Sequence, residues 1–129
     1  MRVLLDTHVF LWWVSEDGRR LSPTARSLLE DPATEGFVSA VSGMEIAAKA
    51  AIGRLELPRV AEGYVPDRIA RHGFEPLSID LAHVLRAGSL PPIHGDPWDR
   101  LLIAQAQLES LPLVTADPVI GQYEVDVVW

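Results

Sequence analysis

Short apolar runs alternate along this chain with longer segments whose apolar residues recur at helical spacing. The first run, Val3-Leu4-Leu5, is continuous and stops at Asp6, which is typical of a strand buried on both faces. Further runs predict strands over residues 37–41, 74–79 and 113–115, and an edge strand over 125–128. Strands that alternate with helices in this way predict an α/β fold, a three-layer α/β/α sandwich around a central parallel sheet.

The predicted helices have recognisable start signals. Ser22 and Asp96 each stand directly before a proline, which places a capping residue ahead of the first helical position. Ser42 and Glu45, three residues apart, fit a capping box that opens the third helix. The predicted helices cover residues 7–14, a segment from 23, 42–53, 67–72, 81–87 with Asp80 as cap and Gly88 as stop, and the apolar segment 97–109.

The length and composition predict one compact domain over residues 1–129. A chain of 129 residues with 48% hydrophobic residues and a mean hydropathy of +0.14 is long and apolar enough for one buried core. Its apolar runs are too short for a membrane span, and its start does not resemble a signal peptide. Because cysteine is absent, disulfides, thiolate zinc sites and a cysteine nucleophile are excluded. We therefore expect a cytoplasmic protein.

The formal net charge of −7 does not favour a broad basic surface for nucleic acid. Several of the acids are candidates for metal ligands, however, and a bound cation would offset their charge. All but one of the basic residues are arginines, whose guanidinium groups suit phosphate. The charge therefore leaves nucleic-acid binding open but does not predict tight, non-specific binding.

Three acids are predicted to meet at one edge of the sheet. Asp6 ends the first strand, Glu45 lies one turn into the helix after the second, and Asp117 lies two residues beyond Thr115. In open α/β sheets, ligands bind beyond the carboxyl ends of the strands. A fourth acid, Asp99, lies in the first turn of the buried helix, where the helix dipole favours it, and joins the others if that helix starts at the same edge.

Such a cluster of like charges predicts a bound cation, because the charges repel one another unless a cation lies among them. Oxygen ligands without cysteine favour a hard ion, Mg²⁺ or Mn²⁺, over zinc. A hard ion polarises a phosphoryl group and activates a bound water. The cluster therefore predicts metal-dependent hydrolysis of phosphodiester bonds without a covalent nucleophile.

Each acid also has a structural explanation. Asp6 can cap the helix that follows it, and Asp96 before a proline is interpreted mainly as a cap. Glu45 fits the capping box and an exposed ion pair with Lys49, while Asp117 fits the start of a turn. Only the convergence of the acids favours a metal site over these readings.

Four segments carry a family resemblance, in the same order from one end of the chain to the other. They are Leu4-Leu5-Asp6-Thr7-His8, Ser42-x-x-Glu45-Ile46 with Lys49, Asp96-Pro97-Trp98-Asp99-Arg100-Leu101-Leu102-Ile103-Ala104-Gln105-Ala106, and Leu113-Val114-Thr115-Ala116-Asp117. The third is the most specific. Together they resemble the PIN-domain ribonucleases, and specifically the VapC-type toxins of bacterial toxin–antitoxin pairs.

The resemblance implies a PIN-like sandwich, a divalent metal site and endonucleolytic cleavage of RNA. By position, the family's acidic quartet of catalytic residues and metal ligands corresponds to Asp6, Glu45, Asp99 and Asp117, with Mg²⁺ as the expected ion and Mn²⁺ as an alternative. Asp96 is an extra acid beside the metal, and Thr115 matches a position where a hydroxyl lies near it. The expected partners are an RNA substrate, a VapB-like antitoxin and a second copy of the chain in a homodimer.

Other residues near these motifs are interpreted as structural. His94 precedes Asp96 by two residues, which would allow it to lie at the mouth of the site, but it is interpreted as a polar loop residue. His8 is interpreted as packing near the site, and Arg100 as a helix-surface arginine rather than a phosphate contact. Trp12 and Trp13 are adjacent on one helix, so at least one is expected to be exposed. An exposed indole there would contribute to a dimer or antitoxin interface.

Two other classes of protein remain as alternatives. Phosphatases of the aspartyl-phosphate type also have an Asp after the first strand, but they need a second acid where this chain has His8. A non-catalytic binding protein or regulator would use the same acids only as caps.

Overall fold

The computed structural model describes residues 1–16 and 18–129. Its elements follow the predicted alternation of strands and helices. In chain order they are β1 (Arg2–Leu5), α1 (Thr7–Glu16), α2 (Pro23–Glu30), β2 (Glu35–Ser39), α3 (Ala40–Ala51), α4 (Ala61–Arg71), β3 (Glu75–Leu77), α5 (Leu81–Ser89), α6 (Pro97–Glu109), β4 (Leu113–Val114), the 3₁₀ turn η1 (Ile120–Gln122) and β5 (Val127–Val128).

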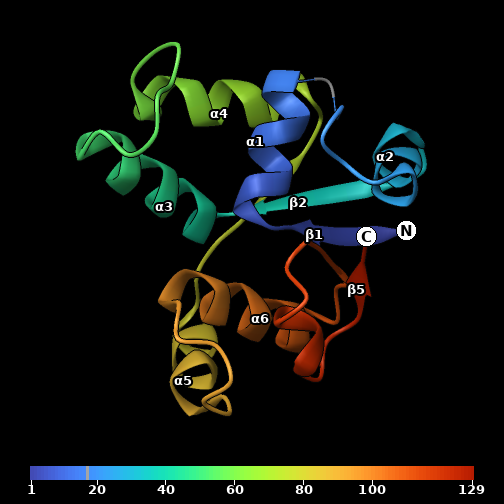
Figure 1. The fold of residues 1–129 in the computed structure, drawn as a ribbon, viewed down its shortest axis with the longest axis vertical. Coiled ribbons are helices and arrows are strands. Elements are labelled where there is room, and N and C mark those ends of the chain that lie inside the picture. Colours follow the sequence, from blue (N-terminus) through green and yellow to red (C-terminus); the bar gives the residue numbers. More distant parts are fainter. Residues whose placement is uncertain (17) are drawn as a thin grey trace.

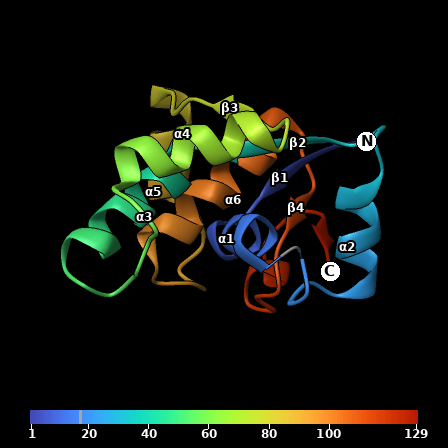
Figure 2. The same ribbon diagram turned by 90° about the horizontal axis from the view of Figure 1, so that it is seen from above.

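The five strands form one sheet in the order β3-β2-β1-β4-β5, and every neighbouring pair is parallel. Helices cover both faces, with α1, α2 and α4 on one side and α5 and α6 on the other (Figure 1). Figure 2 shows α4, α1 and α2 spread across the first face. The predicted three-layer α/β/α sandwich with a central parallel sheet is confirmed.

The alternation of side chains along the central strand supplies both halves of the core. Val3 and Leu5 face the cluster under α1, α2 and α4, whereas Leu4 faces the cluster under α6. All three are fully buried. Burial on both faces explains why the run is continuously apolar, as expected for a parallel strand between two helical layers.

The start of α3 differs from the prediction. The helix begins at Ala40, because Ser39 has an extended backbone and its side chain accepts a hydrogen bond from the Val41 N–H at 2.9 Å. Ser42 therefore lies inside the first turn, where its buried Oγ accepts a hydrogen bond from Thr7 at 2.9 Å. The predicted capping box of Ser42 and Glu45 is wrong.

Other boundaries also shift. The helix predicted over 67–72 is α4, which begins six residues earlier and contains Pro66, with Tyr64 and Val65 buried beside it. That burial offsets the backbone hydrogen bond that an interior proline removes. Gly88 does not end α5, which continues to Ser89. The strands predicted over 37–41, 74–79, 113–115 and 125–128 shorten or shift to the bounds given above, and α1 extends past residue 14.

The predicted starts of α2 and α6 are confirmed, at Ser22 and Asp96. Among the described residues, no helix is long and apolar enough to cross a membrane.

Candidate metal centre

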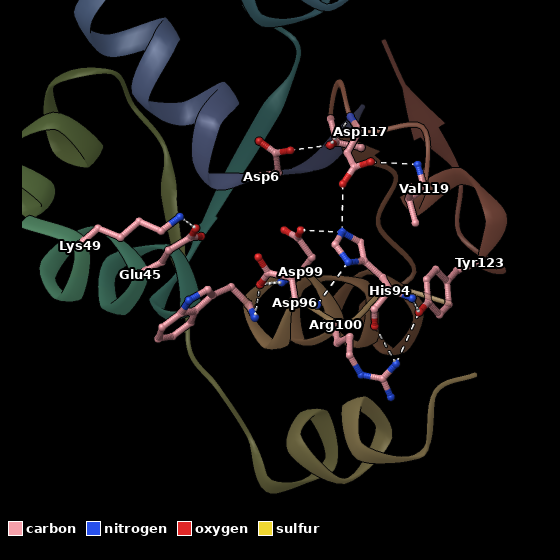
Figure 3. A network of polar contacts seen from close by, with 12 residues as sticks. Asp6, Glu45, Lys49, His94, Asp96, Asp99, Arg100, Asp117, Val119 and Tyr123 are labelled. Carbon is pink, nitrogen blue, oxygen red and sulfur yellow. Dashed lines mark hydrogen bonds and ion pairs between the residues drawn. The ribbon is translucent and has the colours of Figure 1, made fainter. Parts of the chain in front are cut away.

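The sheet order brings the ends of β1 and β4 side by side. Asp6 follows β1 directly, Thr115 follows β4 directly, and Asp117 lies in the turn beyond. Glu45 comes from α3 and Asp99 from the first turn of α6 (Figure 3). The chain continues from β1 towards β2 and β3 on one side, whereas β4 lies on the other, so this edge is the topological switch point of the sheet.

Asp6 is buried, with 7% of its surface exposed. Its Oδ1 accepts a hydrogen bond from the Val9 N–H at 2.9 Å, so it also stabilises the first turn of α1. Its Oδ2 accepts a hydrogen bond from the Thr115 hydroxyl. Burial raises the pKa of the Asp6 carboxyl, and Glu45 raises it further, although the two hydrogen bonds oppose this shift.

Thr115 connects two of the acids. Its buried hydroxyl donates to Asp6 and accepts a hydrogen bond from the Asp117 N–H at 3.1 Å. Asp117 in turn accepts a hydrogen bond at Oδ1 from the Val119 N–H at 2.9 Å. Thr115 therefore fixes how the ends of the two central strands present their carboxylates.

Glu45 has a buried carboxylate with one unpaired oxygen. Its side chain is 4% exposed, and Oε2 forms an ion pair with Lys49, whose side chain is 35% exposed. Oε1 is buried and has no hydrogen-bond partner among the described residues. The predicted pair with Lys49 exists, but it is not an exposed surface pair. A buried carboxylate oxygen without a partner is costly and calls for a donor or a cation.

Asp99 lies where the negative charge is concentrated. The pKa of its carboxyl is raised to about 6, chiefly by burial and further by repulsion from Asp96, Asp6 and Glu45, while His94 opposes the shift. Asp6, Glu45 and Asp99 therefore interact electrostatically. Asp117 is joined to Asp6 through Thr115 and to Asp99 through His94.

Asp96 caps α6, as predicted. Its Oδ1 accepts hydrogen bonds from the Trp98 N–H at 2.8 Å and the Asp99 N–H at 3.3 Å. It also adds to the negative potential at Asp99. A role beside a metal ion stays a prediction.

His94 lies within the site, so its interpretation as a mere polar loop residue is wrong. Its Nε2 lies 2.9 Å from Asp99 Oδ2 and 3.0 Å from Asp117 Oδ2 (Figure 3). The sequence signal was its position two residues before the cap of α6, which brings the loop to the same edge as Asp99.

Arg100 forms hydrogen bonds within the protein, and among the described residues none of them goes to an acid. Its guanidinium donates hydrogen bonds to backbone carbonyls at the end of α5 and in the following loop, those of Ala87, Leu90, Pro91 and His94. The interpretation as an ordinary helix-surface arginine is therefore wrong.

Trp12 and Trp13 are both half-buried, so the expectation that one is exposed is wrong. The Trp12 ring lies 6.2 Å from that of Trp129, and Trp13 packs against Gly18, whose φ of +74° suits glycine. His8 is exposed and lies 5.9 Å from the Trp12 ring, which agrees with its predicted packing near the site.

The donor set fits a hard divalent cation. Carboxylates from four separate segments lie in the same region of the structure (Figure 3), and Asp99 and Asp117 lie, with His94, close enough to hold one ion. Asp6 and Glu45 act on Asp99 electrostatically, and the sequence has no cysteine to supply a thiolate. The unpaired Glu45 Oε1 and the raised pKa values of Asp6 and Asp99 indicate negative charge that the protein's own donors do not satisfy. A cation among these oxygens would supply the missing positive charge.

The fold that carries this acidic edge is that of a PIN domain. The PIN-domain family matches residues 3–126, and the chain belongs to this family. The resemblance found in the sequence is thereby confirmed.

The relatives of the chain include VapC proteins. Ribonuclease VapC22 of Mycobacterium tuberculosis is 37% identical over 119 residues, which are 89% of this chain and 86% of that protein. Ribonuclease VapC16 of the same organism is 41% identical over 58 residues, covering 45% of this chain and less than half, 41%, of that protein.

Solved structures show the same fold. VapBC2 from Rickettsia felis, bound to a DNA fragment from its promoter, has a TM-score of 0.71 at 14% identity and covers 98% of this chain and 97% of that one. FitAcB from Neisseria gonorrhoeae has a TM-score of 0.59 at 19% identity, over 98% of this chain and 96% of that one.

Proposed function

We propose that this chain is a Mg²⁺-dependent endoribonuclease and the toxin of a type II toxin–antitoxin pair. The observation that carries the proposal is the gathering of Asp6, Glu45, Asp99 and Asp117 at the switch point, where the buried Glu45 Oε1 has no hydrogen-bond partner among residues 1–16 and 18–129. Mn²⁺, which accepts the same oxygen ligands, would substitute for Mg²⁺.

Asp6 and Asp99 are the principal ligands in this proposal, and Glu45 and Asp117 complete the site or hold a water molecule. A bound divalent cation supplies Lewis-acid polarisation of the phosphoryl group and activation of water. Thr115 keeps Asp6 in one orientation through its hydroxyl, and Asp96 keeps the first turn of α6 in place. These contacts fix the carboxylates before any ligand arrives, which is the condition for strong electrostatic stabilisation.

RNA as the substrate is supported by the two relatives, both ribonucleases by name. A cavity of about 320 Å³ beside the acids is lined by His8, Glu45, Lys49 and Arg54, among others. The basic side chains of Lys49 and Arg54 offer contacts to phosphate next to the cleavage site, although the chain as a whole is acidic. A phosphatase of the aspartyl-phosphate type has no comparable support.

The partner in this proposal is a small VapB-like antitoxin. It is supported by structural neighbours that are toxin–antitoxin complexes, VapBC2 among them. A homodimer and a cytoplasmic location, where cellular RNA is found, complete the proposal.

The test is a cleavage assay on a mixed cellular RNA pool with Mg²⁺, Mn²⁺ or EDTA. Wild-type protein free of antitoxin is expected to cut in either metal and not in EDTA. Asp6→Asn is expected to abolish cleavage while the fold persists, because asparagine keeps the oxygen that accepts the Val9 N–H. Asp126→Asn, an exposed acid before β5, is the matched control and should cut at the wild-type rate.

Two results would contradict the proposal. One is an Asp6→Asn protein that folds and cuts at the wild-type rate. The other is a folded wild-type protein that cuts no RNA in the pool, which would favour a binding protein with a nuclease fold.

A further inference from the structure

His94 has its ring nitrogen between two of the carboxylates. Its Nε2 approaches Asp99 Oδ2 and Asp117 Oδ2 at 2.9 and 3.0 Å, and its side chain is only 19% exposed. The three groups are close enough to share one metal ion, with His94 as a nitrogen ligand. The same distances also fit an N–H that donates to both carboxylates. The two arrangements require different tautomers of the ring.

The other ring nitrogen decides between them. His94 Nδ1 accepts a hydrogen bond from the Asp96 backbone N–H at 3.2 Å, so it carries no proton. A neutral imidazole has one proton, which must then lie on Nε2. An Nε2 that carries a proton has no lone pair for a metal ion. Coordination through Nε2 would move the proton to Nδ1, where it would face the Asp96 N–H, donor against donor.

The loop around His94 keeps the ring in this position. The His94 N–H donates to the Tyr123 hydroxyl at 2.7 Å, and that hydroxyl donates to Pro91 O at 3.0 Å. Arg100 donates to the His94 carbonyl at 3.3 Å. These bonds hold the backbone from which the ring extends, and the hydrogen bond from the Asp96 N–H to Nδ1 orients the ring itself, since turning Nδ1 to the acids would break that bond.

A second histidine in this chain has the same bonding pattern away from the acidic edge. His83 Nδ1 accepts a hydrogen bond from the Asp80 N–H at 2.9 Å, and its Nε2 lies 2.9 Å from Glu109 Oε1. There the pattern stabilises the start of α5 and joins it to α6. His83 is therefore an internal reference for a histidine that is a donor at Nε2.

We propose that His94 is a positioning residue that keeps its Nε2 proton and remains a hydrogen-bond donor when a divalent cation binds. The inference rests on the proposed function only in taking the acids to bind a cation. By donating to one oxygen of each, His94 fixes Asp99 and Asp117 relative to one another and reduces their repulsion. Both Asp117 oxygens then accept a hydrogen bond, whereas Asp99 Oδ1 accepts none among the described residues. Asp99 is therefore the direct ligand of the two.

The tautomer is measured directly by long-range ¹H–¹⁵N correlation NMR of the ¹⁵N-labelled wild-type protein. Without metal, His94 and His83 should both show an unprotonated Nδ1 and a protonated Nε2. Saturating Mg²⁺ should shift the His94 signals, keep its tautomer and leave His83 unchanged. A His94 proton on Nδ1, before or after Mg²⁺ is added, would overturn the inference.

Pulsed electron paramagnetic resonance of bound Mn²⁺ tests coordination independently, since a nitrogen ligand gives a ¹⁴N coupling. No such coupling is expected from the wild-type protein. A ¹⁴N coupling that disappears in His94→Gln would overturn the inference.

Variants test the role in positioning. His94→Gln keeps an N–H donor that reaches the acids and should bind Mg²⁺ within about threefold of wild type, whereas His94→Leu should weaken binding about 10- to 100-fold, measured by calorimetry. Equal losses in both variants would contradict a donor role.

A protein that binds Mn²⁺ without nitrogen coupling yet cuts no RNA would overturn the proposed function and leave this inference standing. An active ribonuclease whose bound Mn²⁺ shows a nitrogen coupling from His94 would support the proposed function and overturn this inference.

Discussion

Asp99 and Asp6 are acids whose ionised forms are disfavoured where they lie. Burial is the largest cause at both, and the neighbouring acids add repulsion. Acids with pKa values perturbed in this way cluster at functional sites, where their charge serves binding or catalysis. The proposed cation would recover this cost on binding, so the stability of the protein should report on the site.

The first prediction concerns pH. The pKa of Asp99 is about 6 in the folded protein against an ordinary value of 3.8. Between about pH 4 and pH 6 the folded state therefore binds more protons than the unfolded state, and the free energy of unfolding falls as the pH rises through this window. Asp6 contributes with the same sign. Mg²⁺ offsets the charge, so it should raise the melting temperature more at pH 7.5 than at pH 5.

Calorimetry or fluorescence melts in EDTA and in Mg²⁺ at both pH values check this. In Asp99→Asn the melting temperature in EDTA should fall less between pH 5 and pH 7.5, and Mg²⁺ should raise it less at pH 7.5. An Asp99→Asn protein with the wild-type response to pH and Mg²⁺ would contradict the prediction.

The positions of the acids could be predicted from the sequence, whereas for His94 only its nearness to the site could be, not its contacts with Asp99 and Asp117. Asp6 and Asp117 follow apolar runs whose ends must meet at one sheet edge, so topology alone predicts their proximity. The role of His94 depends on the conformation of a loop. That conformation is fixed by Arg100 and Tyr123, which lie six and 29 residues further along the chain. No local pattern encodes such contacts.

At the scale of elements, Arg100 joins α5, the following loop and α6. It donates to Ala87 O and Leu90 O, both at 2.9 Å, and to Pro91 O at 3.0 Å. Carbonyls at the end of α5 are therefore satisfied by a side chain rather than by a glycine cap. This explains why Gly88 does not end the helix.

The second prediction concerns the hydrogen bonds that Arg100 makes to the end of α5 and the following loop. Arg100→Lys keeps the charge but loses the planar fork that reaches several carbonyls at once. The free energy of unfolding should fall by about 1–3 kcal/mol, because several carbonyls, most of them in partly buried hydrogen bonds, lose their donor at once. Urea unfolding measures the change. Arg86→Lys, which loses one exposed hydrogen bond to Gln107, is the matched control and should stay within about 0.5 kcal/mol of wild type. Equal effects of the two substitutions would rule out a special role for Arg100.

Element boundaries were predicted well where one capping residue dominates and poorly where two compete. Ser22 and Asp96 each precede a proline and cap the helices as predicted. Ser39 and Ser42 are both suitable caps, but β2 ends at Ser39 and its side chain caps α3. The helix predicted over 67–72 begins instead at Ala61, and the burial of Tyr64 and Val65 extends α4 across Pro66. Tertiary packing decided these cases.

At the scale of the whole molecule, exposed apolar side chains gather on α5. Leu81, Val84 and Leu85 are 73%, 47% and 65% exposed and lie at the i, i+3 and i+4 positions of one helix face. Trp12 and Trp13, which suggested an interface on the first helix, are half-buried by the chain itself. The homodimer proposed above is therefore better supported through α5, since a self-complementary apolar stripe suits a twofold interface.

The last prediction tests that interface. Leu85→Glu places a charge in the middle of the stripe, which a second copy would have to bury at high cost. Light scattering coupled to size-exclusion chromatography should give the wild type twice the chain mass of 14.2 kDa and the variant the chain mass alone. Met44→Glu, at a similarly exposed site on α3, is the control and should remain dimeric. A monomeric wild type at micromolar concentration, or a dimeric Leu85→Glu, would contradict pairing through α5. Because Leu85 lies outside the acidic edge, Mg²⁺ binding by the variant should match that of the wild type, which separates loss of the dimer from loss of the site.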